Sequence, residues 1–203
     1  MTNNQNMTRD THILGLVLAG GKSTRMGRDK GLLSYHGIPQ REYLYQQMRP
    51  LCREVFLSIR PEQEDTIPGG FACITDENKY RGPLNGLLSA HHAYPDAAWL
   101  VVACDLPLVD RGVLEYLLAR RNPNAMATAF ATRKTGLPEP LAAIWEPHGL
   151  KAAESHLQTS ESSCPRKFLI NTETALVYPE DDLWVANANE PEEYEALLDK
   201  LNS

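Results

Sequence analysis

The part of the chain best suited to chemistry is a glycine-rich, basic segment over residues 18–30. It reads LAGGKSTRMGRDK and follows the apolar run 13–17. Glycines lack a Cβ, so the backbone can turn sharply and bring its N–H groups close to phosphate oxygens, while the lysines and arginines add positive charge. The segment therefore predicts a nucleotide-binding loop.

Three named motifs do not fit this loop. A Walker P-loop, G-x-x-x-x-G-K-[ST], would need lysine where Gly21 stands. A dinucleotide fingerprint, G-x-G-x-x-G, needs alternate glycines, whereas Gly20 and Gly21 are adjacent. A serine nucleophile elbow, G-x-S-x-G, would need glycine at Arg25. The segment is a phosphate loop of another kind.

A carboxylate follows a second apolar run. Asp105 comes after residues 99–103 and before Leu106 and Pro107. One interpretation is a helix cap or a salt bridge. Burying an ionised carboxylate without a partner costs several kcal/mol, which a divalent cation with phosphate ligands would offset. A phosphate loop at the same sheet edge favours the metal interpretation, with Mg²⁺ as the ion.

Two further polar segments precede predicted helices. Gly82 and Pro83 follow Asp76 and begin a helix, since proline is favoured at a first helical position. Taken alone, that segment is a turn and a helix start. Asn187 and Asn189 stand before the last predicted helix, where either can cap the helix or complete a magnesium shell. Position alone does not choose between these uses.

Other titratable residues have simpler interpretations. His91 and His92 fall late in a predicted helix, which favours surface positions or an interaction with the helix dipole. Glu139 stands between two prolines that hold the chain extended, so it either faces a ligand or closes a sheet edge.

The elements that must position these residues follow from alternating apolar runs and helical patterns, which are typical of βαβ units. Runs that are apolar throughout, such as 99–103, indicate a mostly parallel sheet with helices on both faces. Ligands bind beyond the carboxyl ends of such strands, so the loops after Leu18, Ile59, Ile74 and Ala103 should share one edge. Strands are expected at 13–18, 55–59, 72–74, 99–103, 125–130, 142–145 and 175–178, and helices at 40–51, 84–92, 110–120, 147–157 and 191–201.

Length and composition limit the function classes. The 203 residues suit one globular domain, with a disordered polar extension expected over residues 1–12 and the folded domain over 13–203. The net charge of −6 argues against a general nucleic-acid binder. The four cysteines are widely spaced without zinc-site or disulfide patterns, and no segment suits secretion or a membrane span. A cytoplasmic protein is expected.

The order of the motifs points to a family. The motifs are LAGG at 18–21 with Ser23, RMG at 25–27, Asp29 and Lys30, GPLNG at 82–86, CDLP at 104–107 and NANEPE at 187–192. In this order the chain resembles molybdenum cofactor guanylyltransferases, over about residues 13–201. The first motif is shared with the wider sugar-nucleotidyltransferase-like superfamily. The resemblance implies a single-domain, three-layer α/β/α fold with the Rossmann-like, mostly parallel sheet of nucleotide-diphospho-sugar transferases.

The resemblance also implies an activity and its residues. GMP would pass from GTP to the phosphate of molybdopterin by direct in-line attack on the α-phosphate, giving the guanine dinucleotide cofactor and pyrophosphate with Mg²⁺ as cofactor. Gly21 favours guanine, because related cytidylyltransferases carry alanine there. By this resemblance the nucleotide-binding residues are Leu18, Ala19, Gly20, Gly21, Lys30, Asp76, Gly82, Pro83 and Asp105, the catalytic residues are Arg25, Lys30 and Asp105, and the metal ligands are Asp105 and Asn189, with Asn187 as the alternative.

Three other functions stay open at this point. They are a cytidylyltransferase of the same cofactor, a nucleotidyltransferase for another phosphorylated metabolite, and a GTP-binding regulatory protein without activity. The resemblance implies molybdenum-insertion and cofactor-delivery proteins as partners. We expect a monomer that binds neither nucleic acid nor membrane.

Overall fold

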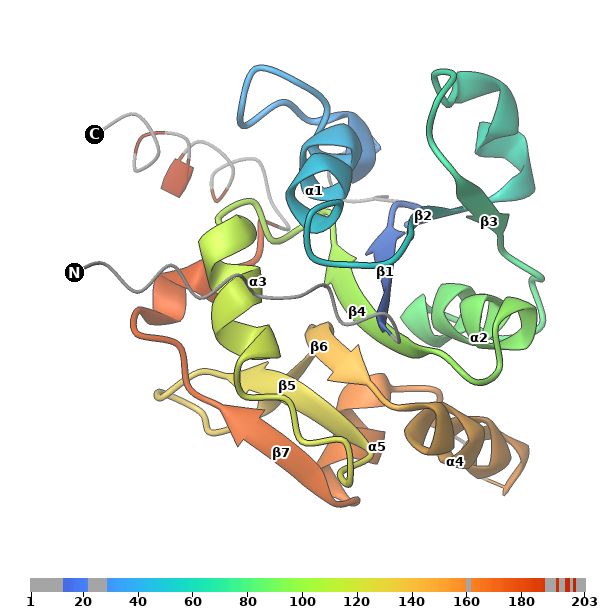
Figure 1. The fold of residues 1–203 in the computed structure, drawn as a ribbon, viewed down its shortest axis with the longest axis vertical. Helices are drawn as coiled ribbons and strands as arrows, with labels where there is room; N and C mark the ends of the chain where they lie inside the picture. The colour runs from blue at the N-terminus through green and yellow to red at the C-terminus, as the bar shows by residue number, and fades with distance from the viewer. Residues whose placement is uncertain are drawn as a thin grey trace.

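The chain folds around one seven-stranded sheet with strand order β3-β2-β1-β4-β6-β5-β7 (Figure 1). The structure is a computed structural model, and it describes residues 13–21, 29–159, 162–188, 193, 196, 197 and 199. The expected extension over 1–12 lies outside the described residues. The strands are β1 (Ile13–Leu18), β2 (Val55–Ile59), β3 (Cys73–Thr75), β4 (Ala98–Ala103), β5 (Ala127–Ala131), β6 (Pro138–Trp145) and β7 (Thr174–Val177).

The sheet is mostly parallel, as predicted. β1 pairs in parallel with β2 and β4, β2 with β3, and β5 with β7. β6 runs antiparallel to both of its neighbours, β4 and β5. Every residue of β2, β4 and β5 is buried, because apolar helices cover the sheet on both sides.

Helices form the two outer layers (Figure 1). α1 and α3 pack on one face through Leu44, Met48 and Leu117, and α2, α4 and α5 pack on the other through residues such as Leu87 and Leu150. The predicted three-layer α/β/α fold is confirmed. The helices are α1 (Gln40–Met48), α2 (Pro83–Ala93), α3 (Arg111–Leu118), α4 (Pro147–Thr159) and α5 (Pro165–Ile170), with 3₁₀ helices η1 (Lys30–Leu32), η2 (Pro61–Thr66) and η3 (Asp182–Val185).

α5 and β6 differ most from the sequence-based expectation, and the predicted helix over 191–201 lies mostly outside the described residues. α5 was not predicted, because six residues are too few to display a helical period. β6 begins at Pro138 rather than at residue 142, and its pairing with β5 shifts register between Ala129 and Phe130. Prolines are tolerated at the start of a strand and beside such an irregularity, where the ladder lacks a regular donor.

The order in which the chain adds strands reverses between β1 and β4, and this places the predicted loop next to the predicted carboxylate. The chain runs from β1 through β2 to β3 at one edge and then returns through α2 to β4 on the other side of β1. Leu18 and Ala103, the last residues of β1 and β4, are paired. Such a switch point opens a crevice at the carboxyl ends of the strands.

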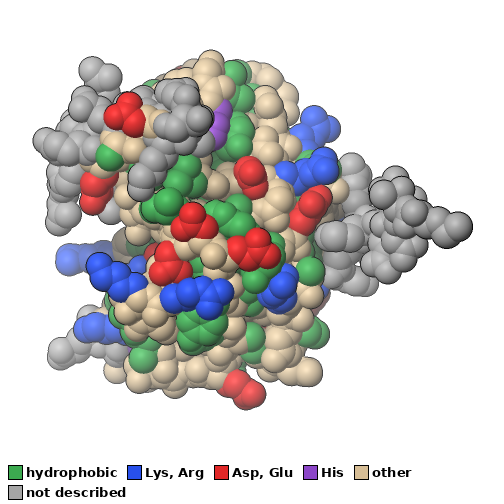
Figure 2. Space-filling model, turned by 90° about the vertical axis from the view of Figure 1, so that its left-hand side faces the viewer, with side chains coloured by type: hydrophobic (Ala, Val, Ile, Leu, Met, Phe, Trp, Pro, Cys, Tyr) green, Lys and Arg blue, Asp and Glu red, His purple; other side chains and the backbone are tan. Residues whose placement is uncertain are grey.

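The surface carries mixed charges. On the left-hand side of the molecule in Figure 1, basic and acidic side chains of the described residues lie next to one another across the middle of the face (Figure 2). Within the described part of the chain, no helix has the length and apolar character that crossing a membrane requires.

Candidate active site

A cleft of about 610 Å³ opens at the carboxyl ends of β1 to β4. It brings together the loops after Leu18, Ile59, Thr75 and Ala103, as expected for the switch point. The described lining residues are Leu18, Ala19, Gly20, Gly21, Asp29, Lys30, Gly31, Ser58, Arg60, Asp76, Asn78, Tyr80, Arg81, Gly82, Pro83, Asn85, Gly86, Ala103, Cys104, Asp105 and Leu141.

Asp105 provides a carboxylate at the end of β4. Its Oδ2 lies 3.6 Å from the Nζ of Lys30, and the Asp105 side chain is only 23% exposed. Its buried Oδ1 has no hydrogen-bond partner among the described residues. Burial raises the pKa of Asp105 above its usual range, although the Lys30 ammonium opposes this shift. A buried oxygen without a donor is suited to a cation.

Lys30 is positioned by its own short helix. Asp29 caps η1, since its Oδ1 accepts a hydrogen bond from the N–H of Gly31 at 2.9 Å. The other oxygen of Asp29 accepts from the Nε2 of Gln63 at 2.7 Å. Lys30 is thus fixed where its ammonium faces Asp105.

Gln63 connects the two ends of the glycine-rich loop. Besides Asp29, its Nε2 donates to the carbonyl of Ala19 at 3.1 Å, and its Oε1 accepts from the N–H of Arg60 at 2.9 Å. The side chain is buried. The Arg60 Nη1 also donates to the carbonyl of Gly20 at 2.7 Å. Both ends of the glycine-rich loop, at residues 19–20 and at Asp29, are therefore held by hydrogen bonds.

Asp76 forms the other carboxylate of the cleft. Ser58 Oγ donates to its Oδ1 at 2.7 Å. Burial raises the pKa of Asp76, and hydrogen bonds from Ser58 and Asn85, together with the charge of Arg60, oppose the shift. A Cβ on Gly86 would collide with Ser58 Oγ, so only glycine lets α2 approach this pair so closely.

The start of α2 also faces the cleft. Gly82 has φ 71° and ψ −161°, a conformation that L side chains rarely adopt, and Pro83 takes the first helical position as predicted. The side chain of Asn85 accepts from the N–H of Tyr80 at 3.1 Å, which fixes the preceding loop. The N–H of Asn85 donates to the carbonyl of Gly82 at 3.1 Å, so the start of α2 favours an anion chiefly through the positive end of the helix dipole.

The C-terminal segment approaches Asp105 from another direction. The N–H of Ala188 donates to the carbonyl of Asp105 at 2.8 Å, so Asn187 stands one residue from a direct contact. Asn189 and Arg25 lie outside the described residues. All the other residues expected at the nucleotide line the one cleft.

Sequence reasoning missed three residues that organise this cleft: Ser58, Arg60 and Gln63. Ser58 and Arg60 flank Ile59 at the end of β2, and that position at the shared edge was the available signal. Gln63 had no comparable signal, because both acceptors of its Nε2 are distant in sequence.

The site geometry can be set beside known proteins. Residues 15–175 match the family model described as MobA-like NTP transferase domain. The chain belongs to this family.

Relatives within the family support the resemblance that the sequence motifs indicated. The chain is 38% identical over 180 residues to the molybdenum cofactor guanylyltransferase of Ectopseudomonas mendocina, covering 87% of each protein. It is 36% identical to the molybdenum cofactor biosynthesis bifunctional protein of Synechocystis sp., covering 91% of this chain and 53% of that protein. The chain thus spans about half the length of the second relative.

A solved structure shares the fold. Molybdopterin-guanine dinucleotide biosynthesis protein A from Archaeoglobus fulgidus superimposes with a TM-score of 0.76 at 20% identity, covering 93% of this chain and 98% of that one. The single-domain nucleotidyltransferase architecture is therefore common to both proteins.

Proposed function

We propose that this protein transfers GMP from GTP to the phosphate of molybdopterin, forming the guanine dinucleotide cofactor and pyrophosphate. Its similarity to named molybdenum cofactor guanylyltransferases supports the proposal. The observation that carries it is the pairing of Lys30 with a half-buried Asp105 whose buried Oδ1 has no partner among the described residues, beside a glycine-rich loop at the β1–β4 switch.

The two carboxylates define the two ends of a nucleotide site. Asp76 follows β3 and Asp105 follows β4, and three strand spacings of about 4.8 Å separate these strands, or about 14 Å in all. That separation suits a nucleoside at one end and its phosphates at the other. Asp76 would take the base end, and Asp105 with Lys30 the phosphate end.

The base end favours guanine. Guanine presents N–H donors at N1 and at its amino group, and a carboxylate such as Asp76 accepts from both. Gly21 lines the cleft, and a Cβ there would meet nothing within 4 Å among the described residues, so glycine leaves that space to the ligand. A cytosine would leave acceptors of the site unsatisfied, which penalises its binding.

A divalent cation fits the phosphate end. Asp105 offers a buried oxygen to which no described residue donates, and carboxylate and amide oxygens suit Mg²⁺. Among the described residues no three His, Cys, Asp or Glu side chains converge, so Asp105 would hold the ion with Asn189 or Asn187 and the substrate phosphates. Bound there, Mg²⁺ would offset the negative charge of the reacting phosphates.

The protein's own residues would act by position and charge. The acceptor is a phosphate oxygen that is already negative, so no strong base is required, and no covalent enzyme intermediate forms. Lys30 and Arg25 would draw charge toward the β- and γ-phosphates as pyrophosphate leaves. The positive end of the α2 helix dipole would help to orient the donor. These contributions are electrostatic and orientational.

The test is an activity matrix of nucleotides against acceptors in the presence of Mg²⁺. Pyrophosphate release from GTP with a molybdopterin acceptor, but not from CTP, is expected. Preference for CTP would instead indicate a cytidylyltransferase, and turnover only with another phosphorylated acceptor would change the substrate. GTP binding without turnover would indicate a regulatory protein. Gel filtration would test the proposed monomer.

A further inference from the structure

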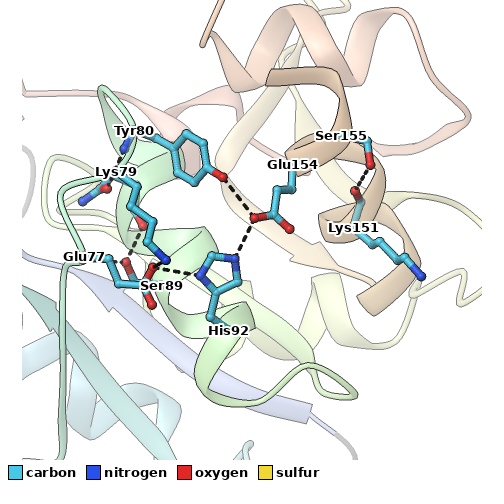
Figure 3. Close-up of polar contacts among 9 residues, drawn as sticks. Glu77, Lys79, Tyr80, Ser89, His92, Lys151, Glu154 and Ser155 are labelled. Atoms are coloured by element: carbon cyan, nitrogen blue, oxygen red, sulfur yellow. Dashed lines mark hydrogen bonds and ion pairs between the residues drawn. The ribbon is translucent and has the colours of Figure 1, made fainter. Parts of the chain in front are cut away.

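A cluster of charged side chains beside the cleft is not explained by the proposed chemistry (Figure 3). We call it the His92 cluster, after the residue at its centre. His92 Nδ1 lies 2.9 Å from Glu77 Oε2, and its Nε2 lies 2.8 Å from Glu154 Oε1. The Tyr80 hydroxyl donates to the same Glu154 oxygen at 3.0 Å, and Lys79 Nζ lies 2.7 Å from Glu77 Oε2.

This geometry requires a protonated imidazole. Carboxylates only accept hydrogen bonds, and neutral histidine has a single N–H, so two simultaneous bonds need both nitrogens to donate. Burial lowers the pKa of His92, but the hydrogen bonds and charges of Glu77 and Glu154 outweigh it and leave the pKa raised. Hydrogen bonds from Lys79 and His92 lower the pKa of Glu77. The cluster therefore consists of a cation between two anions.

The cluster joins three elements. Glu77 belongs to the β3–α2 loop, His92 to the last turn of α2, and Glu154 to α4. Figure 3 shows His92 lying between Glu77 and Glu154, with Tyr80 reaching over to Glu154. The histidine thus ties the loop to a helix that is distant in sequence.

The tied loop is a wall of the nucleotide cleft. Asp76, Asn78 and Tyr80 all line the cleft, and the loop runs between them through Glu77. Its backbone is also bonded to α2, since the N–H of Glu77 donates to Ser89 Oγ at 2.9 Å. A displacement of Glu77 or Tyr80 would therefore change the shape of the base end of the cleft.

We propose that His92 is a positioning residue for the nucleotide, which in its protonated form ties residues 77–80 to α4 and holds the base end of the cleft in shape. This inference rests on the proposed function, because it takes GTP as the ligand of that cleft. His92 itself touches none of the reacting groups; it acts through Glu77, Glu154 and Tyr80.

A pH dependence follows from the charges around His92. Glu77 and Lys79 face it from the loop and Glu154 faces it from α4. His91 adjoins it on its own helix, and the Lys151 side chain on α4 points away from it (Figure 3). Because the folded-state pKa is raised, the contribution of the tie is fully present below the unfolded pKa of about 6.5 and is lost as pH rises through the folded pKa. GTP affinity should fall over the same interval.

The experiment compares wild type with H92Q, E154Q and a matched control, H148Q, which replaces an exposed histidine on α4. GTP affinity is measured by calorimetry across pH 6 to 9 with Mg²⁺. Amide hydrogen exchange of the 76–83 peptide is measured without ligand. Dividing each affinity by that of H92Q at the same pH removes the titration of GTP itself, and H148Q should follow wild type.

H92Q should bind GTP about tenfold more weakly than wild type at low pH, a typical size for coupling between sites, and this difference should shrink as pH rises through the folded pKa of His92. E154Q keeps an acceptor oxygen but removes a charge that raises the pKa of His92, so its affinity should begin to fall at lower pH than that of wild type. If Glu154 acted through packing alone, E154Q would not shift the pH dependence of GTP affinity. H92Q and E154Q should both show faster exchange in the 76–83 peptide.

Two results would overturn the inference. One is wild-type exchange in both H92Q and E154Q, and the other is a wild-type GTP affinity whose ratio to that of H92Q does not change with pH. If GTP is not the ligand of the cleft, the result looks different, because then no variant binds GTP at any pH; a different acceptor or an absence of turnover leaves the binding and exchange results unchanged. The exchange measurement needs no ligand and still decides whether His92 ties the loop.

Discussion

Replacing Gln63 should change the geometry of the glycine-rich loop without altering the other groups that line the cleft. In Q63L a side chain of similar size stays buried, but the carbonyl of Ala19, the carboxylate of Asp29 and the N–H of Arg60 all lose a partner. Neutral hydrogen bonds contribute about 0.5–1.5 kcal/mol and those to charged groups about 1.5–3 kcal/mol. Since water can reach the cleft side of these groups, we expect a stability loss of about 2–4 kcal/mol.

Binding should suffer as well as stability. A loss of that size lowers Tm by roughly 5–15 °C in a chain of this length. If about 1.5–3 kcal/mol of it reflects the fixed positions of Ala19 and Asp29, GTP affinity falls roughly 10- to 150-fold. Scanning fluorimetry measures the first effect and isothermal calorimetry the second. Q158L, on the exposed surface of α4, is the matched control and should leave affinity unchanged.

A second substitution at the same position sharpens the test. In Q63E the oxygen that accepts from Arg60 remains, but the donor is replaced by an oxygen that faces the carboxylate of Asp29. Its defect should diminish as pH falls and the new carboxyl gains a proton that it can donate. Q63L has no such proton and should not recover. A Q63L protein with lower Tm but wild-type GTP affinity would show that Gln63 supports the fold and not the loop, and would refute this reasoning.

The remaining expectations concern the carboxylates and α2. D105N should abolish pyrophosphate release without lowering Tm, because the raised pKa of Asp105 indicates that its charge is costly in the ligand-free protein. The Tm of D105N relative to wild type should increase as pH rises through the folded pKa of Asp105. Turnover equal to that of wild type would remove Asp105 from the mechanism. G86A should displace Ser58 from Asp76, costing about 1–3 kcal/mol and weakening GTP binding, as melting and calorimetry would measure. G112A on α3 is its control, since a Cβ there has its nearest neighbour 3.4 Å away, and Tm should stay level or rise.

Much of the fold could be predicted because its signals are local. The buried strands β1, β2 and β4 are continuous apolar runs, and such runs are visible without knowledge of their partners. The start of α3 is also set locally, because Asp110 caps the helix and its Oδ1 accepts from the N–H of Val113 at 2.9 Å. The direction of β6 was not visible, because a buried strand has the same pattern in either orientation.

The site residues, too, could be predicted only where the sequence signal is local. Asp76 and Asp105 could be placed because they follow strands that end at one edge. Gln63 could not, because its Nε2 bonds residues 44 and 34 positions away. The sequence favoured surface positions or an interaction with the helix dipole for His91 and His92, and a surface position is wrong for His91, a buried residue. His92 is half-buried, and its partner Glu154 lies 62 residues away on α4.

The residues that escaped prediction share a physical role. Asp76 and Asp105 both have pKa values raised by burial, so the ligand-free cleft holds two costly carboxylates. The two carboxylates keep these positions only if the surrounding structure stops them from moving apart and keeps other side chains out of the space between them. Gln63 and His92 supply that restraint from outside the cleft, on the phosphate side and on the base side. The unfavourable free energy of the two carboxylates is relieved by a ligand that brings N–H donors to Asp76 and a cation to Asp105. This favours a metal-bound guanine nucleotide over either component alone.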